Sequence, residues 1–193
     1  MSSAALPAFP STDQAPIVRT AFGAGSDAPW ERLLKMLEVP SDEGFLPYIT
    51  PVDKPGFDGA SPQALFEAAK AAKANYAVIF AADARTFAEP NFPIIVIDIL
   101  GQVEYDEKFN PLPDPPGLQT RTFRCLAAEL WSPENNLNIA NMDWEDFVDA
   151  LDEDGVFRGF PEWRDEQGES VEVPQGGEAV PMRLTTLAHP DES

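Results

Sequence analysis

Four charged side chains lie at positions where an α/β protein gathers catalytic groups. Asp53 and Asp83 come directly after apolar segments that we predict to be strands, and Arg85 follows Asp83 closely. The ends of such strands are where open α/β sheets hold their ligands. Asp98 lies inside the apolar run IIVIDIL, so a buried Asp98 needs a cationic partner, for which Arg85 and Arg19 are the candidates. Carboxylates with an arginine can bind a metal ion or transfer protons, but a structural ion pair has the same composition, and we favour that interpretation.

A glycine pair follows the first predicted strand, in the position of a dinucleotide-binding loop. Gly23 and Gly25 precede a predicted helix, but the pattern ends in Ala28 instead of a third glycine. No acidic residue closes a second strand at the distance that ribose recognition requires. We therefore favour a plain turn, and we expect no cofactor.

Other common sites lack residues that they need. An EF-hand loop with Gly155 at its sixth position places Ala150 and Pro161 where carboxylates are required. The chain has one cysteine, Cys125, and one histidine, His189, which excludes an intrachain disulfide and a zinc site built from these residue types. We expect Cys125 in the core and His189 in a tail, so no catalytic triad is predicted.

The strongest pattern in the chain is a run of acids over residues 143–154. This run contains seven acids and no base. The apolar residues between the acids repeat at helical spacing, and they are Trp144, Phe147, Val148 and Leu151. The spacing predicts an amphipathic helix with an acidic outer face, ended by Gly155 in a left-handed conformation. The candidate partner-binding residues are the acids of this face: Asp143, Glu145, Asp146, Asp149, Asp152 and Glu153.

Charge is distributed unevenly along the 193 residues, whose formal net charge is −20. Residues 1–100 hold 12 acids and 7 bases, whereas residues 101–193 hold 21 acids and 6 bases. A field of this sign repels nucleic acid and anionic membranes and favours a basic partner. Since the start of the chain lacks a basic and apolar leader and no apolar run reaches about 20 residues, we expect a soluble, cytoplasmic protein.

The elements that position these residues alternate along the first half of the chain. The predicted strands are residues 17–22, 46–52, 76–82, 93–100 and 120–127. Helices between the early strands imply parallel pairing, and their absence between the late strands implies antiparallel pairing. Pro47 and Pro51 place the second strand at an edge. We predict one α/β sandwich domain with a mixed sheet of about five strands over residues 16–160, between a disordered tail (1–15) and an acidic tail (161–193).

Several segments resemble a known family. PIVRTAF, VIFAADARTF, IVIDIL and ELWSPENNLNIANMDWEDFVDALDEDGVFRGF lie within residues 16–160 and are similar to a family of small bacterial proteins, common in actinomycetes, that has no assigned activity. ENNLNIANMDWEDF is the most specific part. The resemblance implies an independently folding α/β domain and assigns no functional residue. Family members have a shorter hairpin in place of residues 101–119, so this segment and the 161–193 tail look particular to this chain.

The charge pattern and the lack of a catalytic set favour a non-enzymatic protein that binds a basic protein partner. An immunity protein or inhibitor that masks a cationic surface has these properties. The alternative is a small-molecule or metal-dependent enzyme built on the four residues at the strand ends, and a third possibility is a subunit that self-associates. The asparagines of the family motif fit each of these, as backbone-bonding side chains or as partner contacts: Asn135, Asn136, Asn138 and Asn141.

Overall fold

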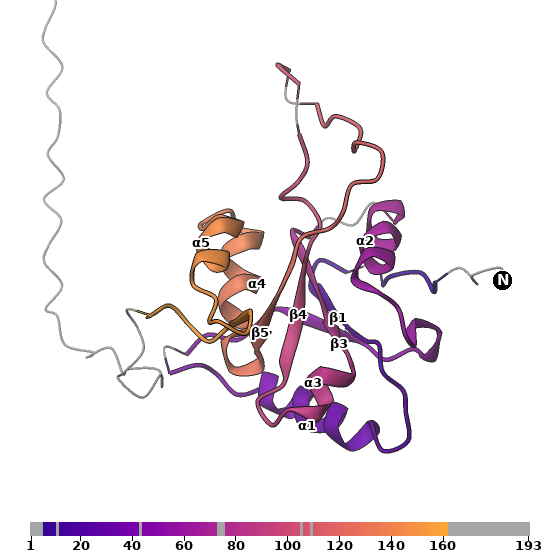
Figure 1. The fold of residues 1–193 in the computed structure, drawn as a ribbon, viewed down its shortest axis with the longest axis vertical. Helices are drawn as coiled ribbons and strands as arrows, with labels where there is room; N and C mark the ends of the chain where they lie inside the picture. The colour runs from indigo at the N-terminus through magenta and orange to yellow at the C-terminus, as the bar shows by residue number, and fades with distance from the viewer. Residues whose placement is uncertain are drawn as a thin grey trace, which may run out of the picture.

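A single mixed sheet forms the centre of the molecule (Figure 1). The computed structural model describes residues 6–10, 12–42, 44–72, 76–104, 106–108 and 110–161. Six strands follow the spatial order β2-β1-β3-β4-β5-β6. Their bounds are β1 Ala15–Arg19, β2 Ile49–Val52, β3 Val78–Ala82, β4 Pro93–Asp98, β5 Thr122–Leu126 and β6 Val156–Phe157. None of the helices in this described part of the chain has the length and apolar character needed to cross a membrane.

The directions of the strands follow the predicted pattern. β1 pairs in parallel with β2 and β3, whereas β3 with β4 and β4 with β5 pair antiparallel. β2 lies at an edge of the sheet, as its prolines predicted. The expected number of strands was one too low, because the two-residue β6 adds in parallel to β5 from the segment after Gly155, where no strand was predicted.

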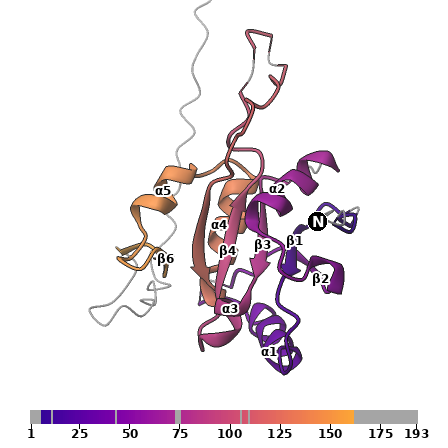
Figure 2. The same ribbon diagram turned by 45° about the vertical axis from the view of Figure 1, so that its right-hand side comes forward.

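Helices cover both faces of the sheet (Figures 1 and 2). On one face, α1 (Asp27–Leu37), α4 (Trp131–Asn138) and α5 (Trp144–Asp149) pack against alternate strand residues. On the other face, α2 (Pro62–Ala71) and the 3₁₀ turn η1 (Pro55–Phe57) pack against the remaining strand residues, which point to that face. All residues of β3 and β4 are buried, which explains their continuous apolar sequences. The short helix α3 (Ala84–Ala88) follows β3, and η2 (Ala127–Glu129) leads into α4.

The acidic helix is shorter than predicted. α5 ends at Asp149, and Gly155 lies beyond it in a turn where its N–H donates to the Asp152 carbonyl (2.8 Å). The positive φ of Gly155 (74°) therefore serves the turn into β6 and does not cap the helix, because the chain must reverse to pair with β5. The apolar stripe is also narrower, since Val148 is exposed while Trp144 and Phe147 are buried.

The predicted tails differ from the structure at one end. Within the segment expected to be disordered, the Phe9 ring packs edge-on against Phe57 (5.6 Å between centroids), and Ala15 begins β1. The apolar side chains at these positions are buried, which a pattern of small and polar residues did not indicate. The predictions for residues 162–193, including His189, lie outside the described residues.

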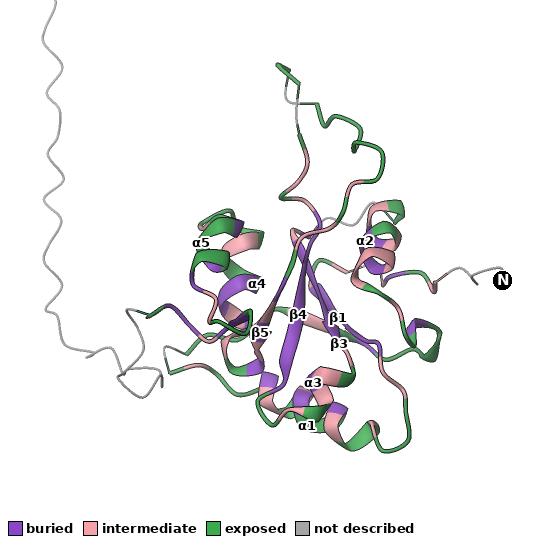
Figure 3. Cartoon of the chain, viewed as in Figure 1, coloured by how far each residue is buried: buried purple, intermediate pink, exposed green. Residues whose placement is uncertain are grey.

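Residues 101–119 are here called the arm, and its described residues (101–104, 106–108 and 110–119) project away from the sheet between β4 and β5 (Figures 1 and 2). Figure 3 shows that most of the arm is exposed. Its base is held at the sheet, because the Gln63 side chain accepts from the Thr120 N–H (2.9 Å) and Gln102 accepts from the Arg121 N–H (3.2 Å). The arm therefore leaves the domain at the end of the sheet where β4 ends and β5 begins.

Candidate binding site

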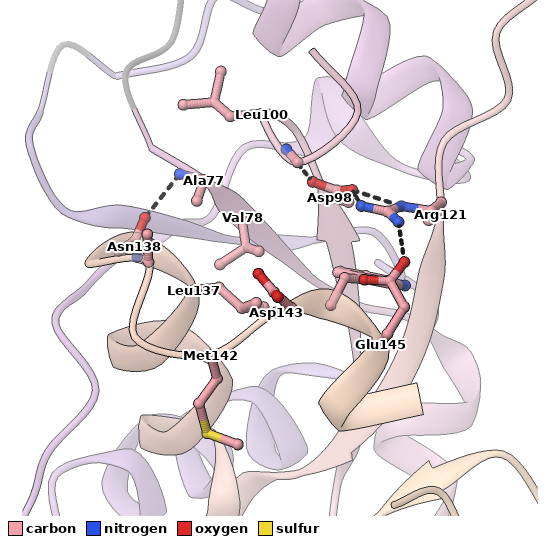
Figure 4. A pocket seen from close by; sticks show the side chains of 13 residues that line it. Ala77, Val78, Asp98, Leu100, Arg121, Leu137, Asn138, Met142, Asp143 and Glu145 are labelled. Atoms are coloured by element: carbon pink, nitrogen blue, oxygen red, sulfur yellow. Dashed lines mark hydrogen bonds and ion pairs between the residues drawn. The ribbon is translucent and has the colours of Figure 1, made fainter. Parts of the chain in front are cut away.

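A pocket lies at the foot of the arm, on the face of the sheet that α4 and α5 cover (Figure 4). Its volume is about 440 Å³, and it is partly open to solvent. Strand ends, the start of the arm and the α4–α5 connection all contribute to its walls. The lining residues are Ala77, Val78, Asp98, Leu100, Gly101, Arg121, Leu137, Asn138, Ala140, Met142, Asp143, Trp144 and Glu145.

A buried ion pair forms one wall of this pocket. Asp98 ends β4 with 2% of its surface exposed, and its Oδ2 accepts from Arg121 Nε (2.8 Å) and Nη2 (2.6 Å). The other oxygen, Oδ1, accepts from the Gly101 N–H (2.8 Å). Burial of a carboxylate is tolerated when its oxygens are bonded in this way. The partner of Asp98 is therefore Arg121, and neither Arg85 nor Arg19, which were the sequence-based candidates.

Arg121 also connects the sheet to the acidic helix. Its Nη1 donates to Glu145 Oε1 (2.8 Å), and its guanidinium carbon lies 5.2 Å from the centroid of the Trp144 ring. Trp144 in turn packs against Phe123 of β5, with 4.8 Å between ring centroids. All three nitrogens of the guanidinium thus donate to carboxylates inside the domain, while an aromatic ring fixes its plane.

The start of α5 places a further carboxylate at the pocket. Ala140 adopts a positive φ (52°) in the connection from α4, and the Asp146 carboxylate accepts from the Asp143 N–H (2.7 Å). A side-chain acceptor at this position closes the first turn of a helix. Figure 4 shows the Asp143 carboxylate pointing into the pocket, opposite Val78 and Leu137.

The asparagines of the motif bond within the chain. Asn138 accepts from the Ala77 N–H (2.8 Å) and donates to the Glu134 carboxylate (3.0 Å), and Asn141 donates to Asn136 (2.7 Å). The second oxygen of Glu134 accepts from the Tyr48 N–H (2.9 Å). Burial raises the pKa of Glu134 above its ordinary value, against the effect of these bonds. This part of the motif therefore builds the α4 wall of the pocket.

The predicted acidic surface divides into two parts. Along α5, Asp143, Asp146 and Asp149 are exposed and form no ion pair with any described residue, and Glu145 pairs with Arg121. Beyond the helix, however, Arg158 pairs with Asp152 (2.9 Å) and Asp154 (2.8 Å).

In this second part the negative charge is compensated locally. The hydrogen bond from Arg158 lowers the pKa of Asp154 to about 2, and Arg85 approaches the same carboxylate at 3.7 Å. Glu153 remains exposed between the two paired acids. Among the described residues, Asp143, Asp146 and Asp149 along α5 have no ion pair, whereas beyond the helix Glu153 alone has none.

The four residues of the alternative enzyme site do not come together. Asp53 and Asp83 follow β2 and β3, whose partner β1 runs parallel to both, so they lie at one end of the sheet. Asp98 ends the antiparallel β4 and pairs with Val78 at the start of β3, so it lies at the opposite end. Arg85 bonds to Glu89 (2.6 Å) on the exposed side of α3.

Each of the two carboxylates at the far end has a structural partner. Asp53 pairs with the buried Arg19 (3.2 Å), and Asp83 pairs with Arg124 (2.6 Å) while accepting from the Thr86 N–H at the start of α3. Burial raises the pKa of Asp83, but the bonds from Arg124 and Thr86 outweigh this effect and leave the pKa below its ordinary value. Within the described part of the chain, no three His, Cys, Asp or Glu side chains are grouped so as to hold a metal ion.

The remaining sequence candidates have ordinary roles in the fold. A Cβ on Gly23 would meet nothing within 4 Å, so this loop contains no close approach that requires glycine there, and Gly25 (φ 83°) forms a turn. Cys125 is fully buried in the core, where burial raises the pKa of its thiol well above the ordinary value. An inert core position was the sequence-based expectation for this cysteine.

Sequence reasoning missed the contribution of Arg121 to the pocket. Side chains alternate between the two faces along β5, so the odd-numbered Arg121 lies on the same face as Phe123 and Cys125. This alternation was the sequence feature that could have placed Arg121 at the pocket. The pairing with Asp98 depends on the antiparallel register of β4 and β5, which no local pattern specifies.

Comparison with known proteins identifies the family. No curated protein and no solved structure matches the chain. Residues 14–160 match one family model, and they include all six strands and every residue of the pocket. Because this match spans most of the chain, the protein belongs to the family described as a domain of unknown function, DUF6924.

Proposed function

We propose that the protein is a non-enzymatic binding protein whose acidic surface on α5 holds a basic protein partner. The observation that carries this proposal is the uncompensated charge of Asp143, Asp146 and Asp149 beside an open pocket. Excess charge of one sign destabilises a compact state through self-repulsion. A partner of opposite charge removes that repulsion on binding.

The arm also carries a net negative charge, which is consistent with a basic partner. Residues 101–119 contain four acids and one base, and the arm leaves the domain beside the pocket. Of these acids, Asp114 pairs with Lys70 of α2 (3.0 Å). A basic partner that approaches the pocket thus meets negative charge from both the arm and α5, which accelerates association and makes it sensitive to salt.

An inhibitor or immunity protein that masks a cationic surface is the functional class that fits this arrangement best. Such a protein needs a rigid, charged surface and no reacting groups. Asp98 of the enzyme alternative lines the pocket, but the carboxylates of that alternative lie at opposite ends of the sheet and each is bonded to an arginine, which argues against a shared site.

The test is affinity capture of partners at low ionic strength, followed by charge reversal on α5. The double variant Asp146→Lys/Asp149→Lys changes the net charge by four units, and we expect it to weaken binding at least about tenfold. The matched control is Glu31→Lys/Glu38→Lys, which makes the same charge change at α1, toward the other end of the molecule (Figure 1).

The proposal is contradicted if no partner is captured, or if the α5 and α1 variants weaken binding equally. The size of the isolated protein, measured in solution at two concentrations, separates partner binding from self-association. Only self-association makes that size depend on concentration.

A further inference from the structure

The pocket at the foot of the arm combines an apolar wall with an excess of carboxylates. Leu100 and Leu137 provide aliphatic surface, while three carboxylates and one guanidinium provide charge. A volume of about 440 Å³ is in the range of pockets that hold small ligands or single side chains. The ligand must therefore have both an aliphatic part and a polar end.

The charges in the pocket select a cation. Arg121 already donates to Asp98 and Glu145 through all three of its nitrogens, so its charge is shared between two carboxylates. The Asp143 carboxylate has no cation of its own among the described residues, and it points into the pocket. An anionic ligand would face Asp143 and Glu145 without a free arginine, whereas a cation gains a partner.

The cation is organic. Among the described residues no group of three potential ligands is arranged to hold a metal ion, and a metal ion has no use for the aliphatic wall. An ammonium group at the end of a hydrocarbon stem uses both parts of the lining, because the stem packs on Leu137 while the charged end reaches Asp143.

We propose that this pocket binds a lysine side chain supplied by the protein partner, with the ammonium group held by Asp143 and Glu145. This inference rests on the proposed function for the source of the lysine. Gly101 at the start of the arm and Asp143 and Glu145 at the start of α5 line the pocket, so it lies next to the two acidic segments that a basic partner approaches. A single inserted side chain then fixes the orientation of a partner that long-range charge only attracts.

The test uses the full chain and a short peptide probe. The acetylated and amidated peptide Ala-Ala-Lys-Ala-Ala is titrated at low ionic strength, and the shifts of the Val78 and Leu137 methyl groups and the Trp144 indole N–H are followed by NMR. We expect saturable shifts at these groups. The matched peptide with norleucine in place of lysine keeps the hydrocarbon stem without the charge, and it should produce no saturable shift.

Two variants separate the pocket from the general charge of α5. Asp143→Asn removes the carboxylate in the pocket but keeps a good helix N-cap, and we expect it to weaken peptide binding at least about fivefold. Asp149→Asn makes the same charge change on the same helix outside the pocket, and we expect less than a twofold effect, about that of a screened surface charge. An unchanged amide spectrum away from the pocket shows that each variant is folded.

The inference is wrong if the lysine peptide does not saturate, if norleucine binds as well, or if the two variants weaken binding equally. If 1,5-diaminopentane saturates the pocket and the peptide does not, the proposal that a protein partner supplies the cation is wrong. The natural ligand is then a free amine. None of these results affects the α5 charge-reversal experiment, so failure of the pocket and failure of the acidic surface are distinguishable.

Discussion

The two ends of the sheet differ in how their charges are paired, although each has an arginine at its centre: Arg124 of β5 at one end and Arg121, which directly precedes β5, at the other. At one end Arg124 pairs with Asp83, and the nearby Arg158 and Arg85 pair with the acids that follow α5 and with Glu89. At the other end Arg121 alone pairs with Asp98 and Glu145. The remaining acids of α5 form no ion pair within the described part of the chain.

This difference shows that one acidic run in the sequence has two physical roles. The acids of the turn before β6 hold Arg158 and so shape the domain. Among the acids at α5, Asp143 and Glu145 line the pocket, and Asp143, Asp146 and Asp149 form no ion pair within the described domain. Only the second role leaves charge for a partner to meet, and we therefore propose the pocket end as the functional end.

The largest predicted effect is the difference in stability between variants of Arg121, which directly precedes β5, and of Arg124 in β5. Arg121→Ala leaves Asp98 buried without its counter-ion, and we expect a loss of about 3 kcal/mol in the free energy of unfolding. Arg124→Ala should cost only about 1 kcal/mol, because the Asp83 side chain is 29% exposed and keeps its bonds to Thr86. Denaturant unfolding of both variants measures the difference, and equal losses would show that the two pairs are equivalent.

A smaller effect on stability is predicted when glycines at the two ends of the sheet are replaced by alanine. A Cβ on Gly101 would lie 2.8 Å from Asp98 Oδ1 and 2.9 Å from Arg121 Nη2, so Gly101→Ala must displace the buried ion pair. We expect a loss of about 2 kcal/mol. Gly23→Ala, at the opposite end, meets open space and should change stability by less than about 0.5 kcal/mol. Thermal unfolding distinguishes these values, and a neutral Gly101→Ala would mean that the pair is loosely held.

The smallest predicted effect is the acid sensitivity of the compensated end. The pKa of Asp83 is lower in the folded chain than its ordinary value, so its contribution to stability is fully present above that ordinary value. The contribution is lost as the pH falls through the lowered pKa. Asp83→Asn, which can still cap α3, should therefore lose less stability than the unchanged protein between about pH 6 and about pH 2. Parallel stability curves for the two proteins would contradict the role of this pair.

Much of the fold was predictable because it depends on local patterns. The continuous apolar runs of β3 and β4 indicated strands buried on both faces, and the prolines near β2 indicated an edge. The end of α5 was not predictable from local patterns. The residues after the helix lead into β6, and β6 forms by pairing with β5, which is distant in the sequence.

The pocket was less predictable than the fold. Asp98 was recognised as a buried carboxylate that needs a cation, but its partner is set by strand register and not by sequence proximity. The sequence treated the acids of residues 143–154 as one group, yet which of them are paired depends on the position of Arg158 after the turn. Pairing across a sheet or a turn is a tertiary property that residue spacing does not contain.

The most direct test of the account is to locate where a cation binds. The full ¹⁵N-labelled chain is titrated with tetralysine at low ionic strength, and backbone amide shifts are mapped onto the structure. We predict that the shifts concentrate on Leu100, Gly101 and residues 137–149, and that they disappear at high salt. Shifts centred on Asp83, Asp152 and Asp154, or spread evenly over the surface, would contradict the claim that the pocket end is the functional end.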